Sequence, residues 1–279
     1  MIPLFDAHCD TLFRCWREER SMDDGALAVS FGHMAGLEPY TQVYAVFTDR
    51  SGRAGYDAMM AIARRELADV RHRCVFSVEG AEGIGCDESF LPQAYADGVR
   101  AINLCWNRDN ALCGSAMDGA SGLTEAGRSF VRAMERLGIY ADVSHMSDTA
   151  FWDLIEMAER PVIASHSNSR TLCPWARNLT DKMFRAVAQT GGCVGINFCA
   201  GFLGRGRDVE AAVDHAEHFL ALGGEKSVGL GSDFDGCETA EGLADLRGLE
   251  ALYNAMLRRN WAESLVRDIF YYNFERLFS

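Results

Sequence analysis

The feature that most constrains this chain is an alternation of short apolar runs with longer segments of helical periodicity. The runs are rich in β-branched residues or end in turn signals, which is typical of buried strands. Eight such runs cover residues 4–8, 42–48, 74–79, 99–105, 140–145, 161–166, 193–198 and 228–233. Between most of them, apolar residues recur at the spacing of an amphipathic helix. The pattern predicts an α/β fold with parallel strands, and eight strand–helix units predict a (β/α)8 TIM barrel.

Helix-capping signals are clearest in the middle of the chain. Thr124 and Ser147 each precede a helical segment with an acidic residue in its first turn, so both are predicted N-caps. Gly138 is predicted to end the helix before the fifth strand. Residues 204–224 are expected to supply the last crossover helix after an irregular loop.

The length and composition favour one domain. The chain has 279 residues, 48% of them hydrophobic, and α/β barrels commonly reach about 250 residues as one domain. The sequence contains neither an internal repeat nor a flexible linker. We therefore expect a single barrel domain over residues 1–279 rather than two small domains.

The charge and the cysteines limit partners and location. The net charge of -13 disfavours binding to nucleic acid or to an anionic membrane surface. The N-terminal MIPLFDAHCD has no features of an export signal, and no apolar run is long enough to span a membrane. The ten cysteines are scattered singly, which indicates reduced thiols. These observations predict a cytoplasmic protein, and a homodimer is possible.

The first strand ends in residues that can bind a metal ion. Strand alternation turns Asp6, His8 and Asp10 to one side and Cys9 to the other. His8 and Asp10 can then share one cation, whereas Asp6 is expected to orient a ligand and Cys9 to fill the core. A hydrogen-bonded turn is the alternative interpretation of this short motif.

Three further strands end in candidate ligands. Glu79 closes an apolar strand, where a buried carboxylate would need a metal ion or an ion pair, and its two oxygens could bridge two cations. The alternative is a salt bridge to a loop arginine. His145 and His166 end adjacent strands in the same way, and neutral imidazole is a preferred ligand of zinc-like ions. The remaining histidines are expected to be surface or capping residues: His33, His72, His215 and His218.

The last strand ends in Gly-Ser-Asp-Phe-Asp-Gly, which brings Asp233 to the mouth of the barrel. A carboxylate next to a dinuclear centre can accept a proton from water and return it to a leaving amine. Asp233 is therefore the candidate proton shuttle, with a simple loop as the alternative. Together these residues predict a barrel of the metallo-dependent hydrolase type.

With these residues in hand, the chain resembles the membrane dipeptidase (renal dipeptidase) family of metallopeptidases, peptidase family M19. The resemblance runs almost end to end and forms an ordered set. Matching stretches are DAHCDTL at 6–12, SVEG at 77–80, LTEAGRSFVRAMERLGIYADVSHMS at 123–147, PVIASHSNSRTLCPWARNLTD at 161–181, GGCVGINF at 191–198, VGLGSDFDG at 228–236 and RNW at 259–261.

The resemblance implies two Zn²⁺ per chain, or other divalent metal ions, held by five residues. It implies that His8 and Asp10 bind one zinc, that His145 and His166 bind the other, and that Glu79 bridges them. This ligand set is the one inferred from the strand ends.

The resemblance also implies catalytic and substrate-binding residues. Asp233 falls at the position of the catalytic aspartate. Arg177 falls at the position of the arginine that holds the substrate carboxylate, for which a guanidinium fork is well suited. The implied reaction is hydrolysis of short L-L or L-D dipeptides by a metal-bridging hydroxide.

One stretch departs from the family pattern. After the fourth strand, Trp106 occupies the place where mammalian members carry a histidine thought to polarise the scissile carbonyl. Indole donates one hydrogen bond but does not exchange a proton near neutral pH. Asn107 or Asn103 could take over that donation, so Trp106 and Asn107 are candidate substrate-binding residues. Alternatives to a dipeptidase are a dinuclear hydrolase of a lactone or another amide, and a catalytically weak metal-binding homologue.

Overall fold

A curled sheet of parallel strands forms the centre of the protein. The computed structural model describes residues 1–49 and 52–279. Within these residues the sheet has seven strands in the order β5-β4-β3-β2-β1-β7-β6. They are β1 (Ile2–Cys9), β2 (Leu37–Phe47), β3 (Arg73–Glu79), β4 (Val99–Asn103), β5 (Tyr140–Asp142), β6 (Val194–Ile196) and β7 (Val228–Leu230).

The sixth predicted strand, at 161–166, closes the ring without forming a regular strand. Ile163 makes an isolated parallel bridge to Asp142 at the end of β5, and Ala164 makes one to Val194 of β6. The next two backbone N–H groups bind side chains instead of a neighbouring strand. The N–H of Ser165 donates to the Asp142 carboxylate at 3.0 Å, and that of His166 donates to the Ser144 hydroxyl at 3.2 Å. The predicted TIM barrel is thus confirmed as a TIM-barrel-like fold, whereas the prediction of eight regular strands is wrong at this segment.

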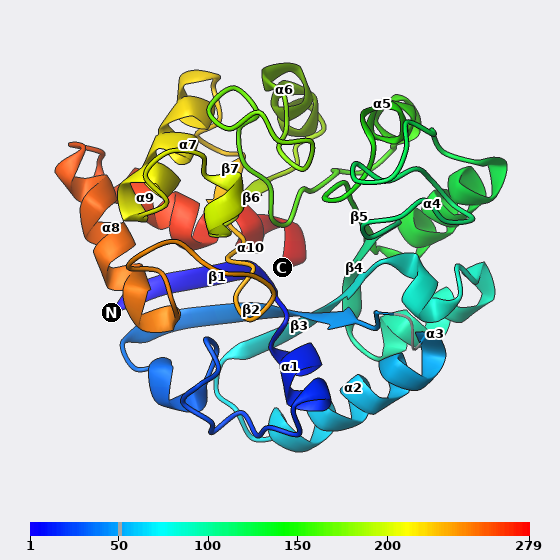
Figure 1. Cartoon of the computed structure of the whole chain (residues 1–279), viewed down its shortest axis with the longest axis horizontal. Helices are drawn as coiled ribbons and strands as arrows, with labels where there is room; N and C mark the ends of the chain where they lie inside the picture. Colours follow the sequence, from blue (N-terminus) through cyan, green and yellow to red (C-terminus); the bar gives the residue numbers. More distant parts are fainter. Residues whose placement is uncertain (50–51) are drawn as a thin grey trace.

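The helices lie around the strands. Figure 1 shows α2 to α8 outside the sheet, with α10 and the C-terminus near the centre of the view. The helices are α1 (Thr11–Arg17), α2 (Gly52–Glu66), α3 (Leu91–Ala96), α4 (Glu125–Leu137), α5 (Asp148–Met157), α6 (Asp181–Gln189), α7 (Val209–Ala221), α8 (Leu249–Arg258), α9 (Glu263–Arg267) and α10 (Asn273–Phe278). The region 204–224 does supply a crossover helix, α7.

The predicted helix caps are confirmed. The Thr124 side chain accepts a hydrogen bond from the backbone N–H of Gly127 at the start of α4. The Ser147 side chain does the same for Ala150 at the start of α5. Gly138 ends α4 with a φ of 83°, a left-handed conformation that favours glycine. These caps fix where α4 begins and ends and where α5 begins.

Two apolar clusters separate the inside of the barrel from its outer layer. The inner cluster combines Phe5 and Val43 from the strands with Phe274 and Phe278 from α10, so the C-terminal helix packs against the barrel interior. The larger cluster lies between strands and helices and includes Cys9, as predicted. All ten cysteines lie in the described ranges and carry free thiols.

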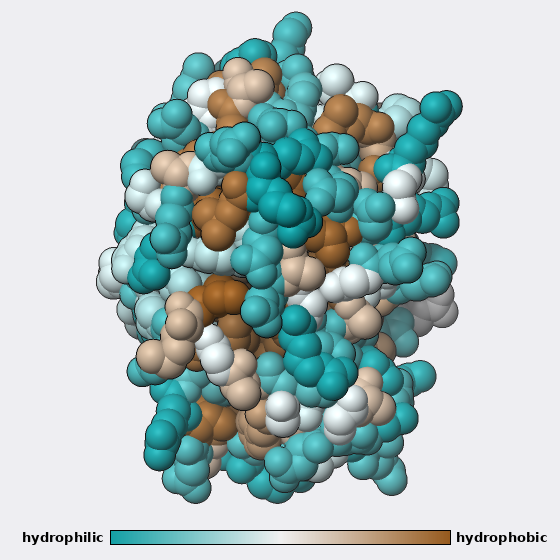
Figure 2. Space-filling model, turned by 90° about the vertical axis from the view of Figure 1, so that its left-hand side faces the viewer, coloured by the Kyte–Doolittle hydropathy of each residue, from teal (hydrophilic) through white to brown (hydrophobic). Residues whose placement is uncertain are grey.

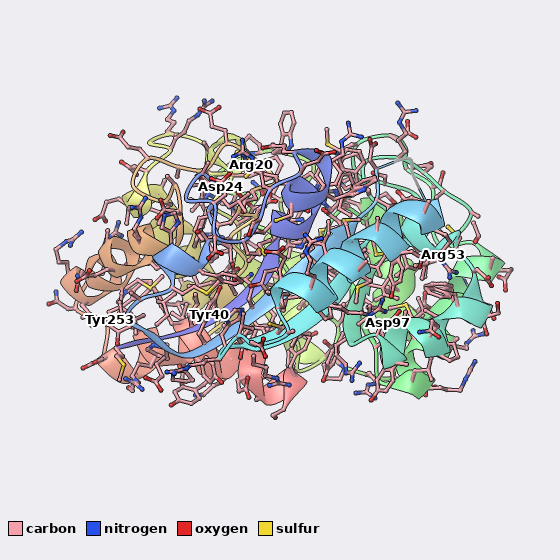
Figure 3. All side chains as sticks on the ribbon, turned by 90° about the horizontal axis from the view of Figure 1, so that it is seen from below. Arg20, Asp24, Tyr40, Arg53, Asp97 and Tyr253 are labelled. Carbon is pink, nitrogen blue, oxygen red and sulfur yellow. The ribbon has the colours of Figure 1, made fainter. Side chains whose placement is uncertain are left out.

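Polar and charged side chains join the neighbouring outer helices α2 and α3. Asp97, after α3, accepts hydrogen bonds from Tyr56 at 3.0 Å and Arg64 at 2.8 Å, both on α2. The Arg53 guanidinium lies 3.3 Å from the centroid of the Phe90 ring. Figure 3 labels Arg53 and Asp97 on this side of the molecule.

The face at the left of Figure 1 is mainly hydrophilic, with small apolar groups between polar residues (Figure 2). Across residues 1–49 and 52–279, no helix has both the length and the apolar character needed to cross a bilayer.

Candidate metal centre

The five predicted metal ligands meet at the carboxyl ends of the strands. Each is almost fully buried, with exposures between 0% and 6%. They come from different elements, as expected for a barrel whose strand ends all face one mouth. The residues are His8 at the end of β1, Asp10 just before α1, Glu79 at the end of β3, His145 after β5 and His166 after the bridging segment.

Glu79 lies between two groups of ligands. Its Oε1 atom is 2.8 Å from the Nε2 atom of His145 and 3.7 Å from that of His166. Its Oε2 atom is 3.7 Å from the Nε2 atom of His8, which is itself 3.3 Å from the Oδ2 atom of Asp10. The two oxygens of Glu79 therefore face different ligand pairs.

The donor atoms fit divalent cations. The Nε2 atoms of His145 and His166 are 3.1 Å apart, and two ligands of one tetrahedral zinc lie about 3.3 Å apart when each bond is about 2.0 Å. His8 Nδ1 and Asp10 Oδ1 are buried and have no hydrogen-bond partner among the described residues. His8, Glu79 and His166 offer ligand atoms within 4.8 Å of one another, as do His8, Asp10 and Asp233.

Burial and charge set the protonation of the site. Burial lowers the pKa values of His145 and His166 well below normal, and nearby cationic groups lower them further. Burial also lowers the pKa of His8, but the charges of Glu79 and Asp10 outweigh it and raise that pKa to about 10. Burial, reinforced by the charge of Asp10, raises the pKa of Glu79. Glu79 and Asp10 thus favour a positive charge at the position of His8. The imidazoles of His145 and His166 are neutral and available as metal ligands.

Hydrogen bonds to the other ring nitrogens orient two of the histidines. The Nδ1 atom of His145 lies 2.9 Å from Oδ1 of Asn107, and that of His166 lies 2.7 Å from Oγ of Ser165. When Nδ1 carries the proton and donates it to the oxygen, Nε2 is left with its lone pair toward the site. The predicted residue Asn107 lines the cavity, but its amide oxygen faces His145. Asn103 is buried and donates to the carbonyl oxygen of Ser144 at 3.0 Å.

Asp233 reaches the same site from the loop after β7. It has a φ of 60°, which is uncommon for a residue with a side chain. The amide of Asn197 donates to its Oδ2 atom at 2.9 Å. Burial raises the pKa of Asp233, although the charge of His8 opposes this effect. Asp233 is therefore held in place with one oxygen engaged and the other facing Gly236, where an added Cβ would lie 2.7 Å away.

The end of β1 departs from simple alternation. The Asp6 carboxylate accepts hydrogen bonds from Gln42 at 2.9 Å and from the Ser232 hydroxyl at 2.7 Å. It reaches His8 through that residue's backbone N–H, at 3.4 Å. The pairing register shifts between Asp6 and Cys9, so the simple alternation assumed in the prediction does not hold between Asp6 and His8.

A cavity of about 420 Å³ opens beside the ligands and contains the remaining predicted residues. Arg177 is 4% exposed, and its Nε and Nη2 atoms have no hydrogen-bond partner in the described part of the chain. Burial lowers its pKa, yet an arginine remains a cation at physiological pH. An unpaired buried guanidinium beside a cavity is suited to an anionic ligand. Trp106, Asn107 and Asp233 line the same cavity.

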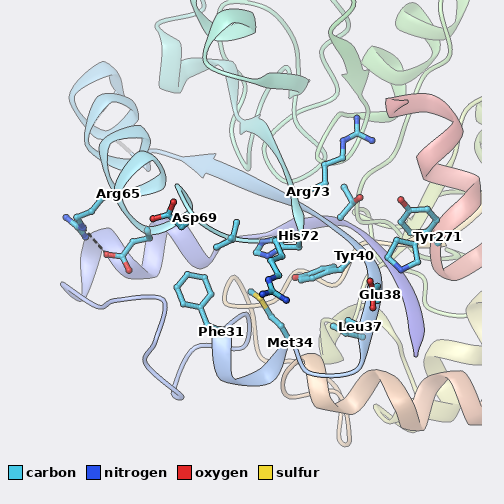
Figure 4. Close-up of a pocket in the computed structure, with 15 residues that line it drawn as sticks. Phe31, Met34, Leu37, Glu38, Tyr40, Arg65, Asp69, His72, Arg73 and Tyr271 are labelled. Atoms are coloured by element: carbon cyan, nitrogen blue, oxygen red, sulfur yellow. Dashed lines mark hydrogen bonds and ion pairs between the residues drawn. The ribbon is translucent and has the colours of Figure 1, made fainter.

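A larger cavity of about 810 Å³ lies at the amino ends of the strands. Figure 4 shows its lining, with His72 beside Tyr40. The Nε2 atom of His72 lies 2.9 Å from the Tyr44 hydroxyl, and burial lowers the pKa of His72 to about 4. The residues described around it include none of the candidate metal clusters. Catalytic groups of such barrels lie at the carboxyl ends of the strands, so the smaller cavity is the candidate active site.

His215 is a structural residue that the sequence did not identify. It is buried, and its Nδ1 atom accepts a hydrogen bond from the backbone N–H of Ser169 at 3.0 Å. Its Nε2 atom lies 3.3 Å from the carbonyl oxygen of Leu203. The prediction of a surface or capping role is wrong for His215. Through its bond to Ser169, His215 supports the segment that leads to Arg177.

The barrel and the cluster at its mouth define a metal-dependent hydrolase. Comparison with known protein families identifies a match. The sequence model of the membrane dipeptidase family (peptidase family M19) matches residues 35–279. This chain belongs to that family of metallodipeptidases. The uncharacterized protein in the pqqA 5′ region of Klebsiella pneumoniae is 40% identical over 217 residues, which are 72% of this chain and 77% of that protein. The chain spans about half the length of several other curated relatives that it matches.

Solved structures show the same fold over the whole chain. A dipeptidase of family M19 is 29% identical, with a TM-score of 0.88 over 99% of this chain and 97% of that one. A metallopeptidase from Rhodobacter sphaeroides, bound to a phosphinate mimic of the dipeptide L-Ala-D-Ala, is 28% identical. Its TM-score is 0.86 over 99% of this chain and 98% of that one.

Proposed function

We propose that this protein is a zinc-dependent dipeptidase that hydrolyses short L-L or L-D dipeptides. The observation that carries the proposal is the position of Glu79 between two ligand pairs, His8 with Asp10 and His145 with His166, beside an unpaired Arg177. Membership of the dipeptidase family and the relative bound to a dipeptide mimic support it. We propose two zinc ions per chain, with Glu79 as the bridging ligand.

Arg177 would bind the C-terminal carboxylate of the substrate. Its buried guanidinium can form two parallel hydrogen bonds to a carboxylate, which also compensates the charge. A substrate anchored there must place its peptide bond at the metal ligands within a cavity of about 420 Å³. This geometry favours dipeptides over longer peptides.

Asp233 would move the proton during hydrolysis. Asn197 holds its Oδ2 atom, so Oδ1 is available to take a proton from the attacking water and return it to the leaving amine. The bound cations would supply a water of lowered pKa and neutralise negative charge on the substrate oxygen. His145 and His166 remain neutral ligands because burial lowers their pKa values.

The lining of the cavity favours one alternative reaction. No histidine other than the candidate ligand His145 lines the cavity within the described residues, and Trp106 is part of its wall. A site that lacks a histidine donor would suit a more reactive bond, such as a lactone or a cyclic amide. A dinuclear hydrolase of such compounds is therefore the second candidate function.

A dipeptide panel tests the proposal. The purified chain is loaded with zinc and assayed with L-L and L-D dipeptides, a lactone and a cyclic amide. We expect dipeptide hydrolysis, and we expect the His145→Ala/His166→Ala double variant to lose it. Hydrolysis of the lactone or cyclic amide alone would favour the alternative. Dipeptide hydrolysis that persists in the double variant would overturn the proposed site.

A further inference from the structure

Three aromatic rings form a continuous row on one side of the candidate active-site cavity. The rings of Phe13 and Phe47 have centroids 4.9 Å apart, and those of Phe47 and Trp106 have centroids 4.7 Å apart. All three residues line the cavity. Phe13 and Trp106 are half-buried rather than enclosed, so part of each ring remains accessible. We call these three residues the aromatic wall.

Phe13 and Phe47 of the aromatic wall lie at the ends of strands on the far side of the barrel mouth from Arg177. Trp106, after β4, extends the wall toward the active-site ligands. The ring runs β1, β2, β3, β4, β5, the bridging segment at 163–164, β6 and β7. Phe47 ends β2, whereas Arg177 follows the bridging segment, four places further around this ring of eight. The candidate metal ligands follow β1 and β3, on either side of Phe47, and β5 and the bridging segment, nearer to Arg177. A dipeptide with its carboxylate on Arg177 and its peptide bond at the ligands therefore extends its N-terminal residue toward the aromatic wall.

The charged residues near the wall are already paired. Arg14 and Glu18 line the same cavity, and the Arg14 Nε atom donates to Glu18 at 3.1 Å. The Nη1 atom of Arg14 donates to Asp235 at 2.9 Å. These contacts leave the ring faces as the available surface for a substrate side chain on this side of the cavity. Aromatic faces favour apolar and aromatic partners.

Resting on the proposed function, we infer that the aromatic wall binds the side chain of the substrate's N-terminal residue. Preferred substrates then carry a large apolar or aromatic side chain at that position. Trp106 contributes a hydrophobic surface, and the backbone oxygen of Trp106 accepts a hydrogen bond from Ser115 at 2.7 Å, which holds its loop in place. The wall is thus a specificity determinant for the dipeptidase reaction.

Dipeptides of reversed order test this inference on the zinc-loaded full-length chain. Values of kcat/KM are measured for Phe-Ala, Leu-Ala, Ala-Ala and Ala-Phe. We expect Phe-Ala and Leu-Ala to exceed Ala-Ala by about tenfold or more, as for a hydrophobic pocket that binds extra methylene groups. We expect Trp106→Ala and, separately, Phe13→Ala to reduce this preference at least about fivefold, mainly through KM. Trp106→Phe should retain most of the preference.

Trp152 provides the matched control, since it is 42% exposed on α5 and does not line the cavity. The preference should persist in Trp152→Ala. Equal values for Phe-Ala and Ala-Ala, or a preference for Ala-Phe that Trp106→Ala removes, would overturn the inference.

Calorimetric binding separates this inference from the proposed function. If no dipeptide is hydrolysed, the proposed function fails. Tighter binding of Phe-Ala than of Ala-Ala, lost in Trp106→Ala, would still support the aromatic wall. Equal binding of the two dipeptides would also overturn the inference that the aromatic wall binds the N-terminal side chain.

Discussion

The Nδ1 atom of His145 lies 2.9 Å from the Oδ1 atom of Asn107, while its Nε2 atom lies 2.8 Å from Glu79. His145 therefore has one ring nitrogen held by an amide and the other directed to the candidate metal ligands. His145 also has a φ of 76°, so its backbone adopts a conformation that few side-chain-bearing residues adopt. Such backbone geometry persists only where surrounding contacts enforce it.

Asn107→Leu should weaken zinc binding by about 10- to 100-fold, because the His145 ring loses the acceptor that fixes its tautomer. Asn107→Asp, which retains an acceptor oxygen, should bind zinc much more tightly than the leucine variant. Competition with a chromophoric chelator measures both affinities. Equal zinc affinity in wild type and Asn107→Leu would contradict this role of Asn107.

Gly236→Ala should displace the carboxylates of Asp10 and Asp233. An added Cβ would lie 2.1 Å from Oδ2 of Asp10 and 2.7 Å from Oδ1 of Asp233. We expect the variant to lose zinc affinity and at least about tenfold in kcat/KM, since catalytic groups tolerate displacements of only a fraction of an ångström. Metal content and dipeptidase assays check this. Gly25→Ala is the control, because a Cβ there meets nothing within 4 Å, and it should behave as wild type.

Asn197→Asp should impair proton transfer while leaving the metal bound. The substitution retains an acceptor for the backbone N–H of Cys199 but removes the amide that donates to Asp233. A second carboxylate beside Asp233 should also raise its pKa. We expect kcat to fall about tenfold or more and the acidic limb of the pH–rate profile to move to higher pH. An unchanged profile would argue against positioning of Asp233 by Asn197.

His215 should make the protein less stable as the solution becomes acidic. Burial lowers its pKa from 6.5 to about 4, so the unfolded chain takes up a proton before the folded protein does. The free energy of unfolding should therefore fall between pH 6.5 and pH 4, by up to about 3 kcal/mol from this residue. His215→Gln, which can keep both hydrogen bonds without titrating, should lose less stability over this range. Urea unfolding at several pH values measures the difference, and parallel curves would contradict it.

The sequence predicts the barrel and the ligand set because both depend on local patterns. A parallel strand is a short apolar run, and its carboxyl end lies at the mouth. His8, Glu79 and Asp233 each end such a run, so their meeting follows from the topology alone. Arg177 lies in an irregular loop, and only the family resemblance indicates it.

Features that depend on contacts between distant segments cannot be predicted from local sequence patterns. The segment 161–166 has the composition of a strand, but the Asp142 carboxylate takes the Ser165 N–H that would extend its pairing. The bond from Asn197 to Asp233 joins the ends of two strands, and only the folded chain shows it. Asn197 could have been suspected from its place after the apolar run GGCVGI, where a polar residue reaches the mouth.

Zinc content by elemental analysis tests the proposed dinuclear centre most directly. Wild type and the His145→Ala/His166→Ala variant are equilibrated with buffered zinc, desalted and analysed by inductively coupled plasma mass spectrometry. We predict about two zinc ions per wild-type chain, as for other two-metal hydrolytic sites, and no more than one in the variant. A wild-type chain that retains no zinc, or a variant that retains as much as wild type, would contradict the account.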